Sequence, residues 1–370
     1  MISTANDNLS IILPTYNESK SILPIINTLL KFDSQYNLEL LVVDDNSSDG
    51  TVSIVRSIAQ KDRRVRLVHR LDRTGLSSAI KEGLLNANGD LVAVMDSDGQ
   101  HEANAVIEAL RKLKAKNLDL VVGSRFLIDS DIQGLSKRRL KGSSIANDFA
   151  RISLPSNYSH LTDFMSGCLV MKREACIPYI YKVDVNGFKF LYELLAVSRG
   201  NLIVGESALV FQPRTHGISK LDIAVFWDFL ISLLHSLSLR LLPRRAISFG
   251  LVGATGIAVQ LLATEILTRV AGLDFVSALP FSVIIAATSN YLINNSLTFR
   301  SKRLKGWTLL KGLVKFLLVA SLPVLANVGL ASSFYTVLDL NTFWSQIAGI
   351  LVVFIWNYVA SSKFVWNTPS

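Results

Sequence analysis

The stretch "DLVAVMDSDGQH", residues 90–101, decides the fold class of the first half of the chain. Its apolar run leads directly into two carboxylates, Asp96 and Asp98, which Gln100 and His101 follow. A short apolar run bounded by turn residues is typical of a buried strand. The stretch therefore predicts a buried strand that carries paired acids at its carboxyl end, where they can meet a ligand or a metal ion.

Runs of the same kind alternate with helical patterns through residues 8–123. The runs are "LSIIL", "LELLVV", "RVRLV", "DLVAVM" and "DLVVG", and helices are expected from about Ser19, Thr51, Thr74 and Glu102. This alternation predicts an α/β fold in which helices cover a parallel sheet. Because ligands of such sheets bind beyond the carboxyl ends of the strands, the residues just after each strand are the candidates for a site.

Three polar segments follow strands: "PTYNE" at residues 14–18, "DDNSSDGT" at 44–51 and "DSDGQH" at 96–101. Each has a simpler interpretation, since Asn, Ser, Asp and Gly also form turns and cap helices. An acidic rim is nevertheless unusual in a chain of net charge +9 unless it binds a cation, or the donor groups of a nucleobase and ribose. Asp96 and Asp98 supply the hard oxygen ligands that suit Mg²⁺ or Mn²⁺.

The second half of the chain has a different composition. Residues 1–220 contain 27 Lys and Arg and 24 Asp and Glu, whereas residues 221–370 contain 11 and 5 and are mostly apolar. Apolar segments of about 20 residues or more predict membrane spans, here at 246–268, 275–297, 312–336 and 343–363. Residues 221–243 mix charges with apolar residues and predict an amphipathic helix in the membrane interface.

The predicted spans repeat themselves and carry their charge on one side. "FGLVGA" and "FLLVAS" begin at Phe249 and Phe316, and "NYLINNSLTF" and "NYVASSKFVW" begin at Asn290 and Asn357, both pairs 67 residues apart. Two helical hairpins of related sequence are therefore expected. Most Lys and Arg of this half fall on the side of the first half of the chain. By the positive-inside rule, that side and both chain termini are expected in the cytoplasm.

Both halves resemble known families. "SIILPTYNE", "LLVVDDNSSDGT", "GLSSAIKEGL", "VMDSDGQH" and "VVGSR", in this order, resemble the inverting family 2 glycosyltransferases of the GT-A fold. More narrowly they resemble the polyprenyl-phosphate sugar transferases, the group of dolichol-phosphate mannose synthase. "SNYLINNSLTFRSK" and "WNYVASSKFVW" resemble the GtrA-like membrane family. The resemblance implies a cytoplasmic GT-A domain at 1–220, the interfacial helix at 221–243, and a GtrA-like transmembrane domain of four helices at 244–370.

The resemblance also implies a donor site. The residues that would line the nucleotide pocket are Pro14, Tyr16, Glu18, Asp44 and Asp45. Asp96, Asp98 and Gln100 would surround a metal ion and the sugar-nucleotide diphosphate, with Asp96 and Asp98 as the catalytic residues. This chain departs from the family at Gly99, where a large apolar residue is usual. That change loosens the turn without removing a ligand.

An acceptor site is implied by three further segments. Arg125 in "GSR", and Arg139 and Ser143 in "SKRRLKGSS", would bind the acceptor phosphate, with Arg138 as the alternative to Arg139. "DFMSG", residues 163–167, matches the acceptor-side loop, and "RTHGISKL" matches a segment that closes over the diphosphate through Arg214 and Lys220. The simpler interpretations are a solvated basic face for the first cluster, an ordinary turn for the second, and a positive-inside anchor for the third.

The expected function is the transfer of one sugar from a nucleotide sugar, GDP-mannose or UDP-glucose, to dolichyl or undecaprenyl phosphate at the cytoplasmic membrane face, with inversion and with Mg²⁺ or Mn²⁺. The alternatives are a processive polysaccharide synthase, and a lipid-linked sugar flippase or scaffold with an inactive transferase domain. The Gln-x-x-Arg-Trp motif of processive synthases is missing from the sequence, where "FQPRTHG" is the nearest string. The expected partners are the donor, the lipid acceptor and the membrane, with no nucleic acid; a homo-oligomer is left open.

Overall fold

A computed structural model describes residues 7–71, 75–127, 130, 137–185, 189–210, 223–321 and 342–367. Within these ranges only the backbone is described at 33–34, 137–141, 223–225 and 342–350. The chain separates into two units, residues 1–237 and 238–370. The three-part division expected from the sequence stays a prediction.

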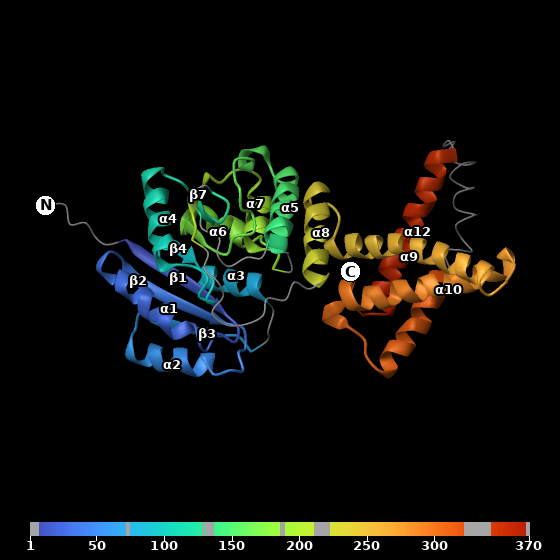
Figure 1. The fold of residues 1–370 in the computed structure, drawn as a ribbon, viewed down its shortest axis with the longest axis horizontal. Helices are drawn as coiled ribbons and strands as arrows, with labels where there is room; N and C mark the ends of the chain where they lie inside the picture. Colours follow the sequence, from blue (N-terminus) through green and yellow to red (C-terminus); the bar gives the residue numbers. More distant parts are fainter. Residues whose placement is uncertain are drawn as a thin grey trace. The chain divides into compact units, whose positions relative to one another are not determined.

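The first unit is built on a sheet of seven strands (Figure 1). Its strands are β1 (Asn8–Thr15), β2 (Asn37–Asp44), β3 (Val65–His69), β4 (Leu91–Val94), β5 (Leu120–Ser124), β6 (Leu169–Lys172) and β7 (Val204–Ala208). Their order across the sheet is β3-β2-β1-β4-β6-β5-β7, and every neighbouring pair is parallel except the two that include β6. The parallel strands predicted from the sequence are therefore confirmed, and β1, β2, β4 and β5 end at the same edge.

Helices cover both faces of this sheet. One core contains side chains of α1 (Ile22–Leu29), α2 (Thr51–Lys61) and α4 (Ala103–Ala115), with η1 (Leu30–Ser34) following α1. The other contains side chains of α3 (Leu76–Asn86), α5 (Lys137–Ser153), α6 (Arg173–Ile180), α7 (Phe190–Ser198) and α8 (Ile223–Leu237), and of η2 (Ser156–Tyr158). A sheet buried on both faces explains why its strands read as nearly continuous apolar runs.

β1 shows how the sequence builds the two layers. Leu9, Ile11 and Leu13 belong to one core, whereas Ile12 belongs to the other, and all four are fully buried. This alternation follows from the two-residue period of a strand. On the Ile12 side, a Cβ atom on Gly83 of α3 would lie 2.5 Å from Ile12 Cγ2. A glycine at this position is therefore what lets α3 pack closely on β1.

β6 is the strand that places the site. It runs antiparallel between β4 and β5, and its first residue, Leu169, pairs with Val94 of β4 and with Val122 of β5. Because the pairing is antiparallel, the residues before Leu169 continue beside the residues that follow Val94 and Val122. The segment "DFMSG" is therefore brought next to the acid motif and next to Arg125.

The second unit is helical over its described residues. It contains α9 (Arg244–Arg269), α10 (Phe275–Ile293), the π-helical turn η3 (Asn294–Thr298), η4 (Arg300–Lys302), a helix over residues 307–321, and α12 (Thr342–Phe364). By length and composition, two helices in the described part of the chain can cross a membrane, at Arg244–Arg269 and Phe275–Thr298. Part of the expected third span, 312–336, lies outside the described residues, so four spans stay a prediction.

The two copies of the repeat meet in an aromatic cluster. Trp366 stacks on Phe299 with ring centroids 4.1 Å apart, and on Tyr291 at 5.6 Å. Trp366 Nε1 donates to Asn295 Oδ1 at 3.1 Å, and the same oxygen accepts from the Leu304 amide at 2.9 Å. Phe299 and Trp366 are the matching positions of the two repeats, 67 residues apart. The repeated sequence thus supplies both faces of one contact.

Candidate active site

The acid turn, residues 95–101, begins where β4 ends and is tied to the end of β1. The Met95 amide donates to the Ile12 carbonyl at 3.1 Å, and Ser97 Oγ donates to the Pro14 carbonyl at 2.6 Å. Gly99 has a φ of 80°, a conformation that glycine adopts at little cost. The turn is therefore fixed at both its start and its middle, and Pro14 is buried beneath it rather than exposed on a rim.

The two acids of the turn have different surroundings. Asp98 is 8% exposed, and its Oδ1 accepts a hydrogen bond from the Gln100 amide at 3.1 Å. The side chain of Asp96 is 31% exposed, and its Oδ2 lies 4.0 Å from Nε2 of the buried His101. Asp98 is thus held inside the turn, whereas Asp96 is the more open of the two carboxylates.

A loop from another part of the chain covers Asp96. This acceptor-side loop, residues 163–167, approaches so closely that a Cβ atom on Gly167 would lie 2.2 Å from Asp96 Oδ2 and 2.7 Å from its Cγ. Only a glycine leaves room for the carboxylate here. The loop and the acid turn therefore form one site, although 71 positions separate Gly167 from Asp96 in the sequence.

Arg125 enters the same site from the end of β5 and is paired with Asp163. Its Nε and Nη2 donate to the two carboxylate oxygens of Asp163 at 2.7 and 2.9 Å. Burial lowers the pKa of Arg125, but the hydrogen bonds and charge of Asp163 and the charge of Asp96 outweigh this and raise it. Arg125 is therefore a permanently charged guanidinium in a fixed orientation near Asp96.

Buried polar groups hold the acceptor-side loop in place. Glu206 of β7 accepts hydrogen bonds from the amides of Thr162 and Asp163, at 2.7 and 3.0 Å. Asn147 of α5 accepts one from the Phe164 amide at 2.9 Å. These hydrogen bonds tie the backbone of the loop to buried acceptors on two neighbouring elements and so rigidify it. The sequence reasoning did not single out Glu206 or Asn147, and no local pattern marks them.

The expected nucleotide residues lie at the ends of β1 and β2. Asp44 is fully buried and accepts hydrogen bonds from Thr15 Oγ1 at 2.9 Å and from the Ser47 amide at 2.8 Å. Glu18 Oε2 lies 2.8 Å from Ser21 Oγ, and Tyr16 is 41% exposed. Tyr16 is thus open to a ligand, whereas Asp44 can act on one only through the loop that it holds. Their roles in nucleotide binding stay predictions.

Arg70, which follows β3, was missed by the sequence reasoning. It is largely buried and pairs with Asp45 Oδ1 at 2.8 Å and with Glu82 of α3 at 2.9 Å. Asp45 also accepts from the Gly75 amide at 3.0 Å. Arg70 therefore fixes the second acid of the "DD" pair. Arg70 lies just after a strand, as the other site segments do, and this position is the signal that would have identified it.

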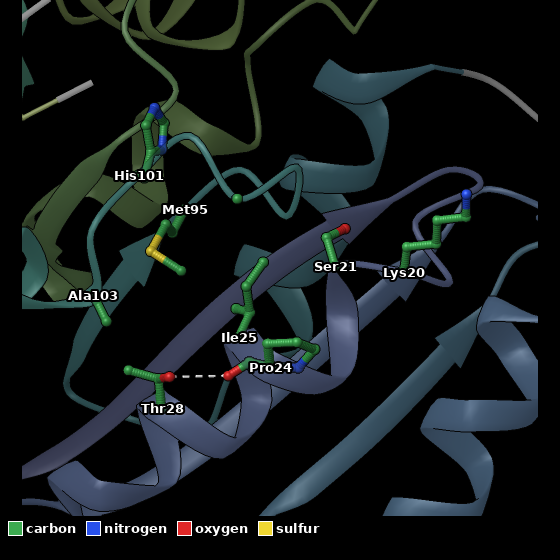
Figure 2. Close-up of a pocket in the computed structure, with 9 residues that line it drawn as sticks. Lys20, Ser21, Pro24, Ile25, Thr28, Met95, His101 and Ala103 are labelled. Carbon is green, nitrogen blue, oxygen red and sulfur yellow. Dashed lines mark hydrogen bonds between the residues drawn. The ribbon is translucent and has the colours of Figure 1, made fainter. Parts of the chain in front are cut away.

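A pocket of about 380 Å³ adjoins the acid turn on the α1 side. Ile25 and Thr28 of α1 lie across it from Met95 and Ala103, as Figure 2 shows. Gly99 also lines it, so the small residue that departs from the family pattern leaves space here. The walls are mostly apolar, and the pocket lies beside the acids rather than over them.

Part of the expected site cannot be placed. Arg139 lies in α5, but its side chain is outside the described residues, as is that of Arg138. Ser143 is half-buried on the same helix. Arg214 and Lys220 lie outside the described residues altogether. The acceptor role of these residues stays a prediction.

The acid turn offers oxygen ligands for a cation. Within the described ranges, no group of three or more His, Cys, Asp and Glu side chains is placed to hold a metal ion. Mg²⁺ is commonly bound by one or two carboxylates that act together with substrate phosphates and water. Asp96, Asp98 and the side-chain amide oxygen of Gln100 are ligands of the kind that act in this way, and their role in holding a cation stays a prediction.

Comparison with known proteins agrees with this geometry. Residues 10–179 match the model of glycosyl transferase family 2, and residues 248–366 match that of the GtrA/DPMS transmembrane domain. A dolichol-phosphate mannosyltransferase of Pyrococcus furiosus is 26% identical over 97% of this chain and 99% of its own length. Another of that name, from Mycosarcoma maydis, is 30% identical over 62% of this chain and 78% of its own length.

Among solved structures, a glucosyl-3-phosphoglycerate synthase from Mycobacterium tuberculosis, in complex with Mn²⁺, UDP and glucosyl-3-phosphoglycerate, is similar to 63% of this chain. The similarity covers 80% of that chain, with 20% identity and a TM-score of 0.47. A TM-score below 0.5 is too low to carry the assignment, which rests on the sequence matches.

The sheet, the acid turn and the sequence matches together define a GT-A glycosyltransferase joined to a membrane domain. The chain belongs to glycosyltransferase family 2, in the group of dolichol-phosphate mannosyltransferases that carry a GtrA/DPMS transmembrane domain. The resemblances read from the sequence are confirmed for both halves, as is the prediction of a membrane protein.

Proposed function

We propose that the chain transfers a single sugar from a nucleotide sugar to a polyprenyl phosphate, with inversion at the anomeric carbon. GDP-mannose and UDP-glucose are the proposed donors, and dolichyl or undecaprenyl phosphate is the proposed acceptor. The names of the two relatives support the mannosyl donor and the lipid class. The observation that carries the proposal is that one loop, residues 163–167, pairs with the buried Arg125 through Asp163 and meets the open carboxylate of Asp96 at Gly167.

The reaction requires little acid-base chemistry from the protein. A phosphate monoester has a second pKa of about 6 and is anionic at neutral pH, so its oxygen attacks the anomeric carbon without a protein base. The new bond joins this oxygen to the anomeric carbon, while the bond to the diphosphate breaks and the nucleoside diphosphate leaves with the electron pair. The attack comes from the side opposite the leaving diphosphate and therefore inverts the configuration at the anomeric carbon.

The protein's part is alignment and charge stabilisation. Arg125 holds the acceptor phosphate with a planar guanidinium, and Arg139 and Ser143 add donors from α5. Arg214 and Lys220 close over the diphosphate and offset its charge. The nucleotide is held by Tyr16 and Glu18 and by the loops that Pro14, Asp44 and Asp45 organise.

A divalent cation, Mg²⁺ or Mn²⁺, is part of the proposal. Asp96, Asp98 and Gln100 would hold it. When bound, it supplies positive charge to the departing diphosphate. The residues themselves bring the donor and acceptor ends of the site together, since the acceptor-side loop contacts the carboxylate of Asp96 through Gly167.

The proposed topology puts the catalytic part and both chain termini in the cytoplasm, with four spans and an interfacial helix at residues 221–243. Basic residues beside the spans support it. Cysteine accessibility in right-side-out and inverted vesicles measures it, with single cysteines placed at Ser301 and at Gly272. Labelling of Ser301→Cys from the outside would contradict the orientation.

The test of the activity uses the full-length protein in detergent or nanodiscs. A short polyprenyl phosphate is incubated with Mn²⁺ or Mg²⁺ and a panel of radiolabelled nucleotide sugars, and the lipid product is separated by extraction. We expect one labelled sugar per lipid, and no product in excess chelator. Polymeric product would instead indicate a processive synthase. Absence of any transfer, with movement of a preformed lipid-linked sugar across liposomes, would overturn the proposal in favour of a flippase.

A further inference from the structure

Asp163 has no assigned role, yet it is the fully buried partner of Arg125. The side chain of Asp163 is 0% exposed and that of Arg125 is 13% exposed. The pair is bidentate, because Nε and Nη2 of the guanidinium each meet one carboxylate oxygen, at 2.7 and 2.9 Å. A paired arrangement of this kind fixes the plane of the guanidinium as well as its position.

The pair with Asp163 occupies one edge of the Arg125 guanidinium. A guanidinium carries five N–H donors in a planar fork. Asp163 takes the edge formed by Nε and Nη2. The second edge, formed by Nη1 and the outer N–H of Nη2, is not part of this pair, and it has the spacing that binds two oxygens of a phosphate. Asp163 therefore fixes the plane of the guanidinium and, with it, the direction of its remaining N–H groups.

The carboxylate of Asp163 is itself immobilised. Oδ1 also accepts from the Met165 amide at 3.1 Å, and Oδ2 from the Arg125 amide at 3.3 Å. Its own amide donates to Glu206. Four residues later, the same loop contacts Asp96 at Gly167. The loop thus carries both the partner of Arg125 and the residue that contacts Asp96, and its backbone is held by Glu206 and Asn147 independently of the Asp163 side chain.

We propose that Asp163 is a positioning residue for the acceptor, which orients Arg125 so that its second edge binds the phosphate of the prenyl phosphate. The inference rests on the proposed function, since it specifies how that acceptor is held. It assigns to Asp163 an effect on acceptor binding that passes entirely through Arg125.

The first test is Asp163→Asn. The substitution removes the charge and puts an amide N–H₂ against a guanidinium edge that can only donate. Losing a hydrogen bond to a charged group costs about 1.5 to 3 kcal/mol, so we expect the KM for prenyl phosphate to rise about 10- to 150-fold. The KM for the nucleotide sugar should stay within about twofold. A general loss of structure would move both values.

A double-mutant cycle separates positioning from an independent contribution. If Asp163 acts through Arg125, then Asp163→Asn should not raise the acceptor KM further in the Arg125→Ala background. Asp163→Glu keeps the charge but moves it by about one methylene, and should rescue only part of the effect. Additive effects of Asp163→Asn and Arg125→Ala would overturn the inference.

Asp62→Asn is the matched control. Asp62 also forms a bidentate pair, with Arg64, with Nε–Oδ1 and Nη2–Oδ2 distances of 2.9 and 2.5 Å, but at the end of α2. Its loss should leave both KM values unchanged. If the Asp163 variants do not fold, Arg125→Lys decides the question. A lysine keeps the charge without the second edge, so its acceptor KM should rise as far as that of Arg125→Ala, and a parent-like KM would refute the proposal.

The outcomes distinguish the two levels of the argument. A parent protein that transfers no sugar to any prenyl phosphate overturns the proposed function. A parent that does transfer, with an acceptor KM that Asp163→Asn does not change, overturns only the role of Asp163.

Discussion

Gly167→Ala tests the contact on which the arrangement of the site depends. The added Cβ would lie 2.2 Å from Oδ2 and 2.8 Å from Oδ1 of Asp96. Since a Cβ atom keeps at least about 3.0 Å from such neighbours, the carboxylate has to move by about 0.8 Å. The φ of Gly167 does not lie in the left-handed region, so the effect comes from space and not from backbone strain.

The displacement predicts a large loss of activity with a smaller change in stability. A shift of about 1 Å in a reacting group can lower the rate on the order of 10²-fold. Overpacking costs about 1 to 3 kcal/mol in a packed interior. Gly167 is only half-buried and the clash is with the end of the Asp96 side chain, so we expect a cost near the lower value, which the lower chain entropy of alanine in the unfolded state offsets by about 0.4 to 1 kcal/mol. We therefore expect kcat to fall about 100-fold in a variant that still folds.

Steady-state kinetics in nanodiscs and thermal unfolding measure the two effects separately. Gly253→Ala is the control, because nothing lies within 4 Å of a Cβ at that position; it should keep the parent kcat. A Gly167→Ala variant with kcat within threefold of the parent and an unchanged melting temperature would refute the reasoning, because the loop would then yield without disturbing Asp96.

Three further predictions concern single side chains. Asp98→Asn should abolish transfer, because it removes one of two charged ligands; full activity at millimolar Mg²⁺ or Mn²⁺ would exclude the metal role. Burial raises the pKa of Asp49, but hydrogen bonds from Thr51 and Ser19 outweigh it and lower the pKa to about 2. The folded pKa is thus below the unfolded value of about 3.9. The ionised carboxylate of Asp49 therefore stabilises the folded protein above about pH 4, and this stabilisation is lost as the pH falls towards 2. Asp49→Asn should make the melting temperature less dependent on pH between about 4 and 2, and an unchanged dependence on pH would contradict the assignment. Burial, and then the charge of Asp96, raises the pKa of Cys168 to about 12, so maleimide at pH 7.5 should label it only after unfolding; rapid labelling of the folded protein, read by mass spectrometry, would be inconsistent with the buried thiol.

The sequence alone predicted strands β1 to β5, the helices α1 to α4 that alternate with them, and the position of the acid turn after β4. Strands β1, β2, β4 and β5 read as apolar runs because they are buried on both faces, and this information is local to four to eight residues. "DSDGQH" marked a site because charged residues at the end of a buried strand are costly unless they have a partner. The apolar composition of residues 246–268 and 275–297 likewise predicted α9 and α10 from local hydropathy.

Only the tertiary structure decided which of these segments meet. Asp163 reaches Arg125 across 38 positions, and Gly167 reaches Asp96 across 71. Both contacts depend on the antiparallel insertion of β6 between β4 and β5. The four residues of β6 carry no signal of their direction, because a buried apolar run fits a parallel or an antiparallel neighbour equally well. Direction and register come from packing of the whole sheet against its two helix layers, which no local pattern contains.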